Sequence, residues 1–302
     1  MLFRSAEHIE NAGVHSGDAT IVLPPEKLYL KTIRRAKQIT RELAKALKIH
    51  GPFNIQFIAK ENDLMVIECN IRASRSFPFV SKVTPYNFIE IAAKVLMGQY
   101  KKQAYNTLEL DHVAVKSPQF SYNRFKGADP VAHVEMASTG EVACIADDLL
   151  SAFYLSWQAT GQEIKNKRIL ISLANPYKAR FGKLLNKLEA KGFELYCTEG
   201  THDYLANLGV GSRCVFKVSE AIEPNVGSVI ADDGVDLIIN LPGSLPQGQT
   251  ASDGFLIRRL AIDHHIPLIT NAKIAELMLR CLTELDKLDL KTKSWNEYLQ
   301  QD

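Results

Sequence analysis

The stretch LMVIECNIRASRSFPF (Leu64–Phe79) begins as an apolar run and ends in polar side chains. Its second half carries the carboxylate of Glu68, the amide of Asn70 and the guanidiniums of Arg72 and Arg75. Hard cations such as Mg²⁺ bind oxygen ligands and bridge protein groups to phosphates, and arginines stabilise charge on a transferred phosphoryl group. The alternative, which the spacing leaves open, is an exposed strand end where Glu68 and Asn70 pair with Arg72.

The run FNIQFIA (Phe53–Ala59) precedes this stretch and is joined to it by the polar residues KEND. Two strand-like runs separated by a short polar turn predict an antiparallel hairpin. If the turn is centred on Asn62, Gln56 lies opposite Glu68. Gln56 then adds a third oxygen-bearing side chain to the same patch.

Side chains alternate between the two faces of a strand, so we expect Leu64, Val66, Glu68 and Asn70 to share one face. At a rise of roughly 3.3 Å per residue, Glu68 and Asn70 lie about 6–7 Å apart. The register is decisive, because a slip of one residue would move the polar groups to the other face.

The chain divides into two blocks of different rhythm. In the first, residues 33–47 place Ile33, Ala36, Ile39, Leu43 and Leu47 on one stripe, which predicts an amphipathic helix. In the second, strand-like runs alternate with helical stretches, which predicts a doubly wound parallel sheet. The strand-like runs are RILISL, ELYCTEG, VDLIINLPG and IPLITN, and the helical stretches are KARFGKLLNKLEAKGF, GFLIRRLAIDHH and AKIAELMLRCL.

The polar, Gly-containing stretch WQATGQEIKNKR between the blocks is suited to a domain boundary. We therefore expect one domain over residues 1–161 and another over residues 162–302. The tail after Leu282 is rich in Lys and Asp and is expected to be a solvated helix end.

Composition limits the classes of function. The chain has 302 residues, 46% of them hydrophobic and 23% charged, which is typical of a soluble globular protein. A net charge of +2 gives no broad electrostatic reason to expect nucleic acid or a membrane surface as partner. Its five cysteines show no CxxC spacing, so zinc sites and a disulfide framework are not expected. Without a disulfide framework, we expect a cytoplasmic location. No apolar run approaches the roughly 20 residues of a membrane span, and the first residues lack a signal-peptide core.

Several of these motifs together resemble one family. VIECNIRASRSFPFVSK resembles the metal-binding stretch of ATP-grasp domains, and specifically of carbamoyl-phosphate synthase large subunits. The likeness continues upstream in EHIENAGVHSGDAT and GPFNIQFIAK, and downstream in EMASTGEVACIADD. The first block is similar to the later part of the second, carbamate-phosphorylating ATP-grasp half of these subunits. The second block is similar to the methylglyoxal-synthase-like regulatory domain that follows that half.

The resemblance implies roles for particular side chains. Metal ligands for Mg²⁺, or Mn²⁺, would be Gln56, Glu68 and Asn70, and the first two would also lie near the phosphates of the substrate ATP. Arg72 and Arg75 would stabilise the transferred phosphoryl group as bidentate donors. The loop residues Gly13, Val14, His15 and Ser16 would line the nucleotide. A zinc site formed by His8, Glu10 and His15 is not expected, because their spacing matches no helix-based zinc motif.

In the second block, CTEGT (Cys197–Thr201) resembles the loop that binds an effector phosphate, and hydroxyls and N–H groups at a helix start suit an anion. By position, the phosphate pocket would comprise Lys178, Thr198, Thr201 and Lys217, with Asn240 beside it. Their expected place at the carboxyl edges of parallel strands favours a crevice.

Two departures from related proteins refine this interpretation of the second block. Methylglyoxal synthases carry a catalytic aspartate where this chain has Leu241 and Pro242, which argues against lyase chemistry. Acetylglutamate-responsive relatives carry a tryptophan where Lys217 stands. A lysine suits a phosphorylated effector of the UMP or IMP type.

The resemblance further implies a ligase that forms carbamoyl phosphate from ATP, bicarbonate and glutamine-derived ammonia, in arginine or pyrimidine biosynthesis. The expected partners are a glutaminase small subunit and the remainder of the large subunit, and the 302 residues alone are expected to be inactive. The chain would be a truncated gene product or one piece of a split enzyme. Two alternatives remain open: a nucleotide-sensing regulatory protein without catalysis, and another ATP-grasp carboxylate–amine ligase.

Overall fold

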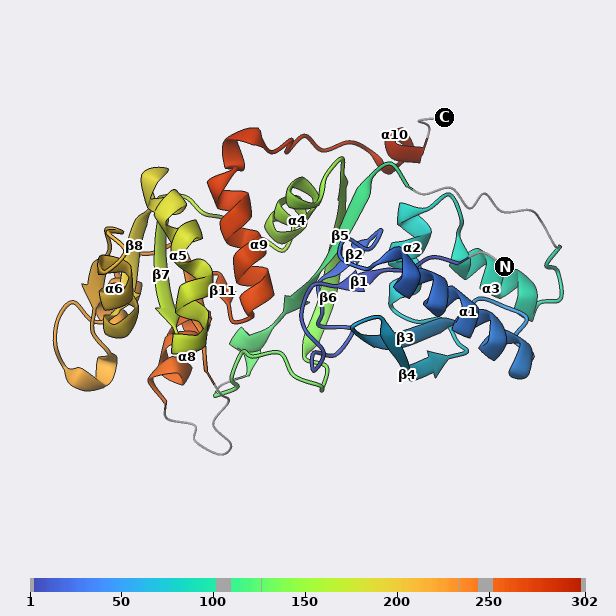
Figure 1. Ribbon diagram of the computed structural model, residues 1–302, viewed down its shortest axis with the longest axis horizontal. Helices are drawn as coiled ribbons and strands as arrows, with labels where there is room; N and C mark the ends of the chain where they lie inside the picture. The colour runs from blue at the N-terminus through green and yellow to red at the C-terminus, as the bar shows by residue number, and fades with distance from the viewer. Residues whose placement is uncertain (1–2, 102–109, 126, 233, 244–251, 300–302) are drawn as a thin grey trace.

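A computed structural model of the protein describes residues 3–101, 110–125, 127–232, 234–243 and 252–299 (Figure 1). The first block contains a four-stranded antiparallel sheet in the order β1-β2-β5-β6. Its strands are β1 (Glu7–His8), β2 (Ile21–Leu23), β5 (Val113–Phe120) and β6 (Ser138–Ala146). The helical elements of this block are α1 (Leu30–Ala46), α2 (Ser76–Val83), α3 (Phe88–Leu96), η1 (Tyr122–Arg124) and α4 (Leu149–Gln158).

The predicted hairpin is present as a separate two-stranded sheet of β3 (Asn54–Lys60) and β4 (Asp63–Asn70). Gln56 pairs with Glu68, which confirms the predicted register. Glu61 and Asn62 form the tight turn with φ of 50° and 75°. This turn is fixed to α1, because Thr32 Oγ1 donates a hydrogen bond of 2.8 Å to Asn62 Oδ1.

The prediction that Leu64, Val66, Glu68 and Asn70 share one face of β4 is wrong. The register shifts between Gln56 and Phe57, because Gln56 pairs with Glu68 whereas Phe57 pairs with Val66, leaving one extra residue on β4. Such a β-bulge breaks the simple alternation of side chains. Val66, opposite Phe57, therefore lies on the other face of the hairpin from Glu68.

The helix predicted over residues 33–47 is α1, which begins three residues earlier. Ala36 is buried as expected, but Leu47 is 55% exposed. Leu47 forms the helix C-cap and not part of the buried stripe. Thr32 and Thr40 are buried beside Ala36, so small polar side chains replace part of the apolar stripe.

The second block contains the predicted parallel sheet, in the order β11-β10-β7-β8-β9 with every neighbouring pair parallel. Its strands are β7 (Arg168–Leu173), β8 (Glu194–Thr198), β9 (Arg213–Val215), β10 (Leu237–Leu241) and β11 (Leu268–Ile269). Its helical elements are α5 (Asn175–Ala190), α6 (Glu199–Ala206), η2 (Val218–Glu220), α7 (Val226–Ala231), α8 (Asp253–Asp263), α9 (Ala272–Thr283), η3 (Leu285–Lys287) and α10 (Trp295–Leu299). The chain is thus α/β, as predicted.

Apolar side chains cover both faces of the parallel sheet. One cluster joins alternate residues of β7 and β10, such as Ile169 and Ile239, with α5 and α9. A second cluster joins Leu170 and Ile238, on the opposite face, with α7 and α8. The first cluster continues through α4 to β2, β5 and β6, so one apolar core connects the two blocks. Figure 1 shows α4 between α9 and the antiparallel sheet.

The carboxyl-terminal tail does not behave as the predicted solvated helix end. It leaves α9 and returns to the first block, where α10 lies beside β5 (Figure 1). The Tyr298 ring is buried, and its hydroxyl donates a hydrogen bond of 2.9 Å to the Ile145 carbonyl. Lys293 pairs with Asp147 at 3.1 Å. Among the helices that the structure describes, none combines the length and apolar character needed to cross a membrane.

Candidate functional site

A cavity of about 870 Å³ lies in the first block between the hairpin, α1, α2 and the loop that follows β1. All nine residues predicted to bind ATP or metal, or to act on the phosphoryl group, line it. They are Gly13, Val14, His15, Ser16, Gln56, Glu68, Asn70, Arg72 and Arg75. The structure therefore brings together residues that are up to 62 positions apart in the sequence (Gly13 to Arg75).

The loop at residues 13–18, which we call the nucleotide loop after its predicted role, is held by hydrogen bonds in its second half. Gly13 adopts φ of 109°, a conformation that favours glycine. The Gly17 N–H donates to His15 Nδ1 at 3.0 Å, and the buried Asp18 carboxylate accepts from two backbone N–H groups at the start of β6. These hydrogen bonds attach the second half of the loop to the start of β6.

The three predicted metal ligands extend from neighbouring positions of the hairpin. Gln56 Nε2 donates to Ser16 Oγ at 3.1 Å, which ties the hairpin to the nucleotide loop and leaves Gln56 Oε1 available. The Glu68 carboxylate is exposed, and no side chain within the described residues binds it. Asn70 pairs with Asn54 across the hairpin.

This donor set fits Mg²⁺, which is typically bound by one or two carboxylates together with substrate phosphates. In the part of the chain that the structure describes, no cluster of three or more His, Cys, Asp or Glu side chains could hold a metal. A site built from protein carboxylates or imidazoles alone is therefore not found there, and one carboxylate with two amides is the candidate.

The two predicted phosphoryl-stabilising arginines follow β4 directly. Both Arg72 and Arg75 are exposed, and Arg75 is the N-cap residue of α2. Arg72 Nη1 donates to the Ala73 carbonyl at 3.1 Å. Neither guanidinium has a carboxylate partner among the described residues, so the predicted alternative of a local Arg72 pair with Glu68 is not found.

The same cavity contains a group of buried or half-buried ionisable side chains, of which sequence analysis missed Lys116 and considered His8 and Glu10 only as zinc ligands. Lys116 of β5 is only 2% exposed, and its Nζ donates to the Gly17 carbonyl at 3.1 Å and lies 3.5 Å from Glu141. Burial lowers the pKa of Lys116, and the nearby carboxylates of Glu141, Glu10 and Asp18 oppose that shift. A lysine within the apolar run HVAVKSPQF was the signal that could have identified it.

Two further members of this group have strongly shifted pKa values. Burial raises the pKa of Glu10 to about 7, although its hydrogen bond from the Thr20 N–H, at 2.8 Å, acts in the opposite direction. Burial, with the charges of Lys116 and His15, lowers the pKa of His8 to about 4. Shifted pKa values in a cavity are typical of functional sites.

The predicted effector residues of the second block lie at the carboxyl edge of the parallel sheet. Lys178 lies in the first turn of α5, and its Nζ is so near Gly200 that a Cβ there would be 3.1 Å away. Thr198 ends β8, and Thr201 is buried in α6. The Thr201 hydroxyl accepts a hydrogen bond of 3.0 Å from the Leu173 N–H, so it also joins α6 to β7.

The other two predicted effector residues lie near the start of α8. The buried Asn240 accepts a hydrogen bond of 2.9 Å from Arg258 Nη1. Lys217 lies 3.5 Å from Asp253 and 3.7 Å from Glu220, and these carboxylates partly neutralise it. In the described part of the chain, neither residue forms a hydrogen bond or an ion pair with Lys178, Thr198 or Thr201, so the five form two groups at one sheet edge.

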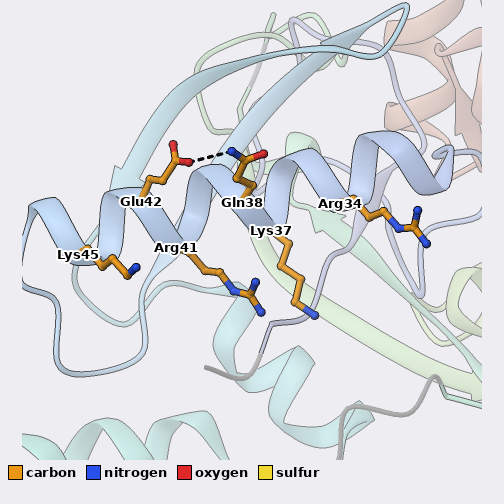
Figure 2. Close-up of a pocket in the computed structure, with 6 residues that line it drawn as sticks. All are labelled: Arg34, Lys37, Gln38, Arg41, Glu42 and Lys45. Atoms are coloured by element: carbon orange, nitrogen blue, oxygen red, sulfur yellow. Dashed lines mark hydrogen bonds between the residues drawn. The ribbon is translucent and has the colours of Figure 1, made fainter.

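A second, shallower hollow of about 390 Å³ runs along the surface of α1 (Figure 2). Its lining is mostly basic and consists of Arg34, Lys37, Gln38, Arg41, Glu42 and Lys45. Gln38 Nε2 donates to Glu42 Oε1 at 2.9 Å, while the basic side chains extend on the other side of the helix (Figure 2). None of the predicted site residues lies there, so we do not assign the candidate site to it.

Comparison with known proteins identifies segments of both blocks. The family model "Carbamoyl-phosphate synthase L chain, ATP binding domain" matches residues 5–103, and the model "MGS-like domain" matches residues 180–270. A human mitochondrial carbamoyl-phosphate synthase of the ammonia type is 42% identical over 95% of this chain and 20% of its own length. Multifunctional protein pyrABCN of Emericella nidulans is 44% identical over 95% of this chain and 13% of its own.

The chain thus spans a fifth or less of the length of these two relatives. Among solved structures, methylglyoxal synthase from Elizabethkingia anophelis NUHP1 covers 47% of this chain and 97% of its own at 18% identity, with a TM-score of 0.32.

Proposed function

This chain is a homologue of one region of carbamoyl-phosphate synthases, a region that joins an ATP-binding segment to an MGS-like domain, and we propose that it is the carboxyl-terminal part of such an enzyme's large subunit. Its first domain, residues 1–161, phosphorylates carbamate with ATP in the complete enzyme. Its second domain, residues 162–302, binds a regulatory ligand. The isolated 302 residues lack this turnover. The observation that carries the proposal is the convergence of Gln56, Glu68 and Asn70 on the cavity that the nucleotide loop also lines.

The side chains of the cavity divide the work of phosphoryl transfer. A divalent cation held by Gln56, Glu68 and Asn70 would neutralise charge on the ATP phosphates. Arg72 and Arg75, which have no carboxylate partner among the described residues, donate hydrogen bonds to the transferred group. A carbamate oxygen attacks the γ-phosphorus, the bond from that phosphorus to the β–γ bridging oxygen breaks, and ADP leaves as carbamoyl phosphate forms. The nucleotide loop supplies backbone N–H groups and the Ser16 hydroxyl to the nucleotide.

Glu68→Gln tests the metal assignment. This change keeps the size of an exposed side chain, so the free energy of unfolding should change by less than about 0.5 kcal/mol. Calorimetry should show MgATP affinity falling at least roughly tenfold, because the single carboxylate of the donor set is lost. Asp63→Asn, on the same strand and outside the cavity lining, is the matched control and should leave affinity unchanged. Equal affinities for wild type and Glu68→Gln would remove the metal assignment.

For the second domain we propose a phosphorylated nucleotide effector, of the UMP or IMP type, bound by Lys178, Thr198, Thr201, Lys217 and Asn240. The support is their common position at the sheet edge and the MGS-like match. Lys178→Gln should weaken UMP binding roughly tenfold in calorimetry, because an ammonium aimed at the α6 N-terminus is lost. Lys183→Gln, an exposed position on the same helix, should not. If both variants bind UMP as wild type does, the pocket lies elsewhere.

The source of nitrogen, the partners and the location also belong to this proposal. We propose a glutamine-hydrolysing enzyme with a glutaminase partner, acting in the cytoplasm in arginine or pyrimidine biosynthesis. The names of the relatives include an ammonia-type mitochondrial enzyme and a multifunctional protein, so those names do not select one form. Activity of the complete enzyme with glutamine, compared with ammonium, distinguishes the two nitrogen sources.

A further inference from the structure

Two consecutive arginines of α8 hold the segment that joins β5 to β6 in the first block. We call residues 121–137, apart from residue 126, the connecting segment. Arg258 is 2% exposed, and its Nε and Nη2 donate to the two carboxylate oxygens of Asp129 at 2.6 and 2.5 Å. Its Nη1 donates to Asn240 Oδ1 at 2.9 Å. A bidentate guanidinium–carboxylate pair fixes orientation as well as distance, so this contact sets where residue 129 lies.

Arg259 adds a second hold on the same segment. Its Nη1 donates to the Phe125 carbonyl at 3.0 Å and to the Ala128 carbonyl at 3.4 Å. Its other donors bind Asp263 of the same helix, which orients the guanidinium. Residues 125, 128 and 129 of the connecting segment are therefore attached to α8 of the second block.

The end of the connecting segment that leads into β6 contacts the nucleotide loop. The His133 carbonyl accepts from the His15 N–H at 2.9 Å. The Ala137 N–H donates to the buried Asp18 carboxylate at 2.8 Å. Met136 packs against the loop so closely that a Cβ on Gly17 would lie 3.0 Å from its sulfur. In Figure 1 this green segment runs from beside α8 toward β6.

We propose that Arg258 and Asp129 are positioning residues for the nucleotide loop, acting across the two blocks through the connecting segment. Neither residue lines the cavity. The inference rests on the proposed function only in identifying residues 13–18 as a nucleotide loop. Since Asn240 binds the same guanidinium, a predicted effector residue and the loop belong to one chain of contacts. Hydrogen-bond and ion-pair networks of this kind can carry coupling between sites, which is measured as a change in affinity.

Hydrogen exchange of the full chain tests the inference without any ligand. Arg258→Met keeps a long apolar side chain and leaves Asp129, which is 33% exposed, accessible to water. The amides of His15, Ala137 and Ser138 should then exchange roughly tenfold faster, because local opening becomes easier. MgATP affinity should fall by a similar factor, since coupling of this kind is typically 5–150-fold. Arg180→Met is the matched control, because Arg180 pairs with Glu276 inside the second block, and it should change neither quantity.

Asp129→Asn is a second variant that tests the same inference if Arg258→Met disturbs folding. This variant weakens the pair from the first block and leaves the Arg258–Asn240 bond in place, and protection of the β7 amides reports that the sheet is intact. The same faster exchange at His15 and Ser138 is expected. Native exchange at these amides in both variants, with β7 protected, overturns the inference. If wild type binds no MgATP, the proposed function fails, while the exchange result still decides whether the pair positions the loop.

Discussion

Glu10 is the side chain whose ionisation most directly links the cavity to stability. Burial raises the pKa of its carboxyl from 4.5 to about 7. Because the pKa in the folded chain lies above that in the unfolded chain, the folded chain binds more protons between these values. The contribution of Glu10 to stability therefore falls as the pH rises from about 4.5 to about 7.

We predict that Glu10→Gln removes this pH dependence while still offering an acceptor to the Thr20 N–H. The free energy of unfolding of the variant minus that of wild type should increase by about 3 kcal/mol between about pH 4 and about pH 8. Urea unfolding at several pH values measures the difference. A difference independent of pH would mean that Glu10 does not titrate with the shifted pKa.

Single residues also show how far the sequence permits prediction. The pairing of Gln56 with Glu68 could be predicted, because a short polar turn fixes the register of a hairpin. The position of Val66 could not, since the bulge depends on how the strands fit their surroundings. The burial of Lys116 could not be predicted either, because it depends on a carbonyl and a carboxylate from distant segments.

Among the elements, the β3–β4 hairpin has the largest influence on the candidate site. Its turn requires positive φ at Asn62, and Asn62 also accepts the hydrogen bond from Thr32 of α1. Asparagine tolerates the left-handed region better than most residues with a Cβ. The turn thus sets both the register of the predicted ligands and the place of the hairpin beside α1.

Asn62→Ala should lower the free energy of unfolding by about 2 kcal/mol, through backbone strain and the lost hydrogen bond. Asn62→Gly, which removes only the hydrogen bond, should cost about 1 kcal/mol. Urea unfolding gives both values. Equal costs for the two variants would show that the left-handed conformation contributes nothing.

The parallel sheet was the easier element to predict. Its strands are buried on both faces and alternate with helices at regular spacing, which is a strong pattern in sequence. The antiparallel strands β1, β2, β5 and β6 and the helix α4 were not predicted, because they are short or packed between blocks. The family resemblance supplied the first block's identity where local pattern did not.

In the complete chain the two blocks are joined by a shared apolar core, by Arg258–Asp129 and by the returning tail. In the tail, Tyr298 is 5% exposed, and the centroid of its ring lies 5.6 Å from that of the His112 ring. The change of sequence pattern near residue 161 is sharp, but the side chains of the two blocks pack and pair with one another across that boundary.

Tyr298→Ala should destabilise the protein by about 3 kcal/mol, because a buried aromatic ring is lost. Tyr298→Phe, which loses only the hydrogen bond to Ile145, should cost about 1 kcal/mol. Unfolding followed by near-ultraviolet circular dichroism measures both. A cost for Tyr298→Ala no larger than that of Tyr298→Phe would show that the tail adds little to the whole fold.

The most direct test of the whole proposal is a crystal structure of the protein with Mn²⁺ and a non-hydrolysable ATP analogue, read by anomalous scattering. The expected result is a manganese peak within about 2.5 Å of oxygens of Gln56, Glu68 and Asn70, with the phosphates facing the loop at residues 13–18. A nucleotide bound in the cavity with its metal away from all three side chains, or bound outside the cavity, would contradict the account.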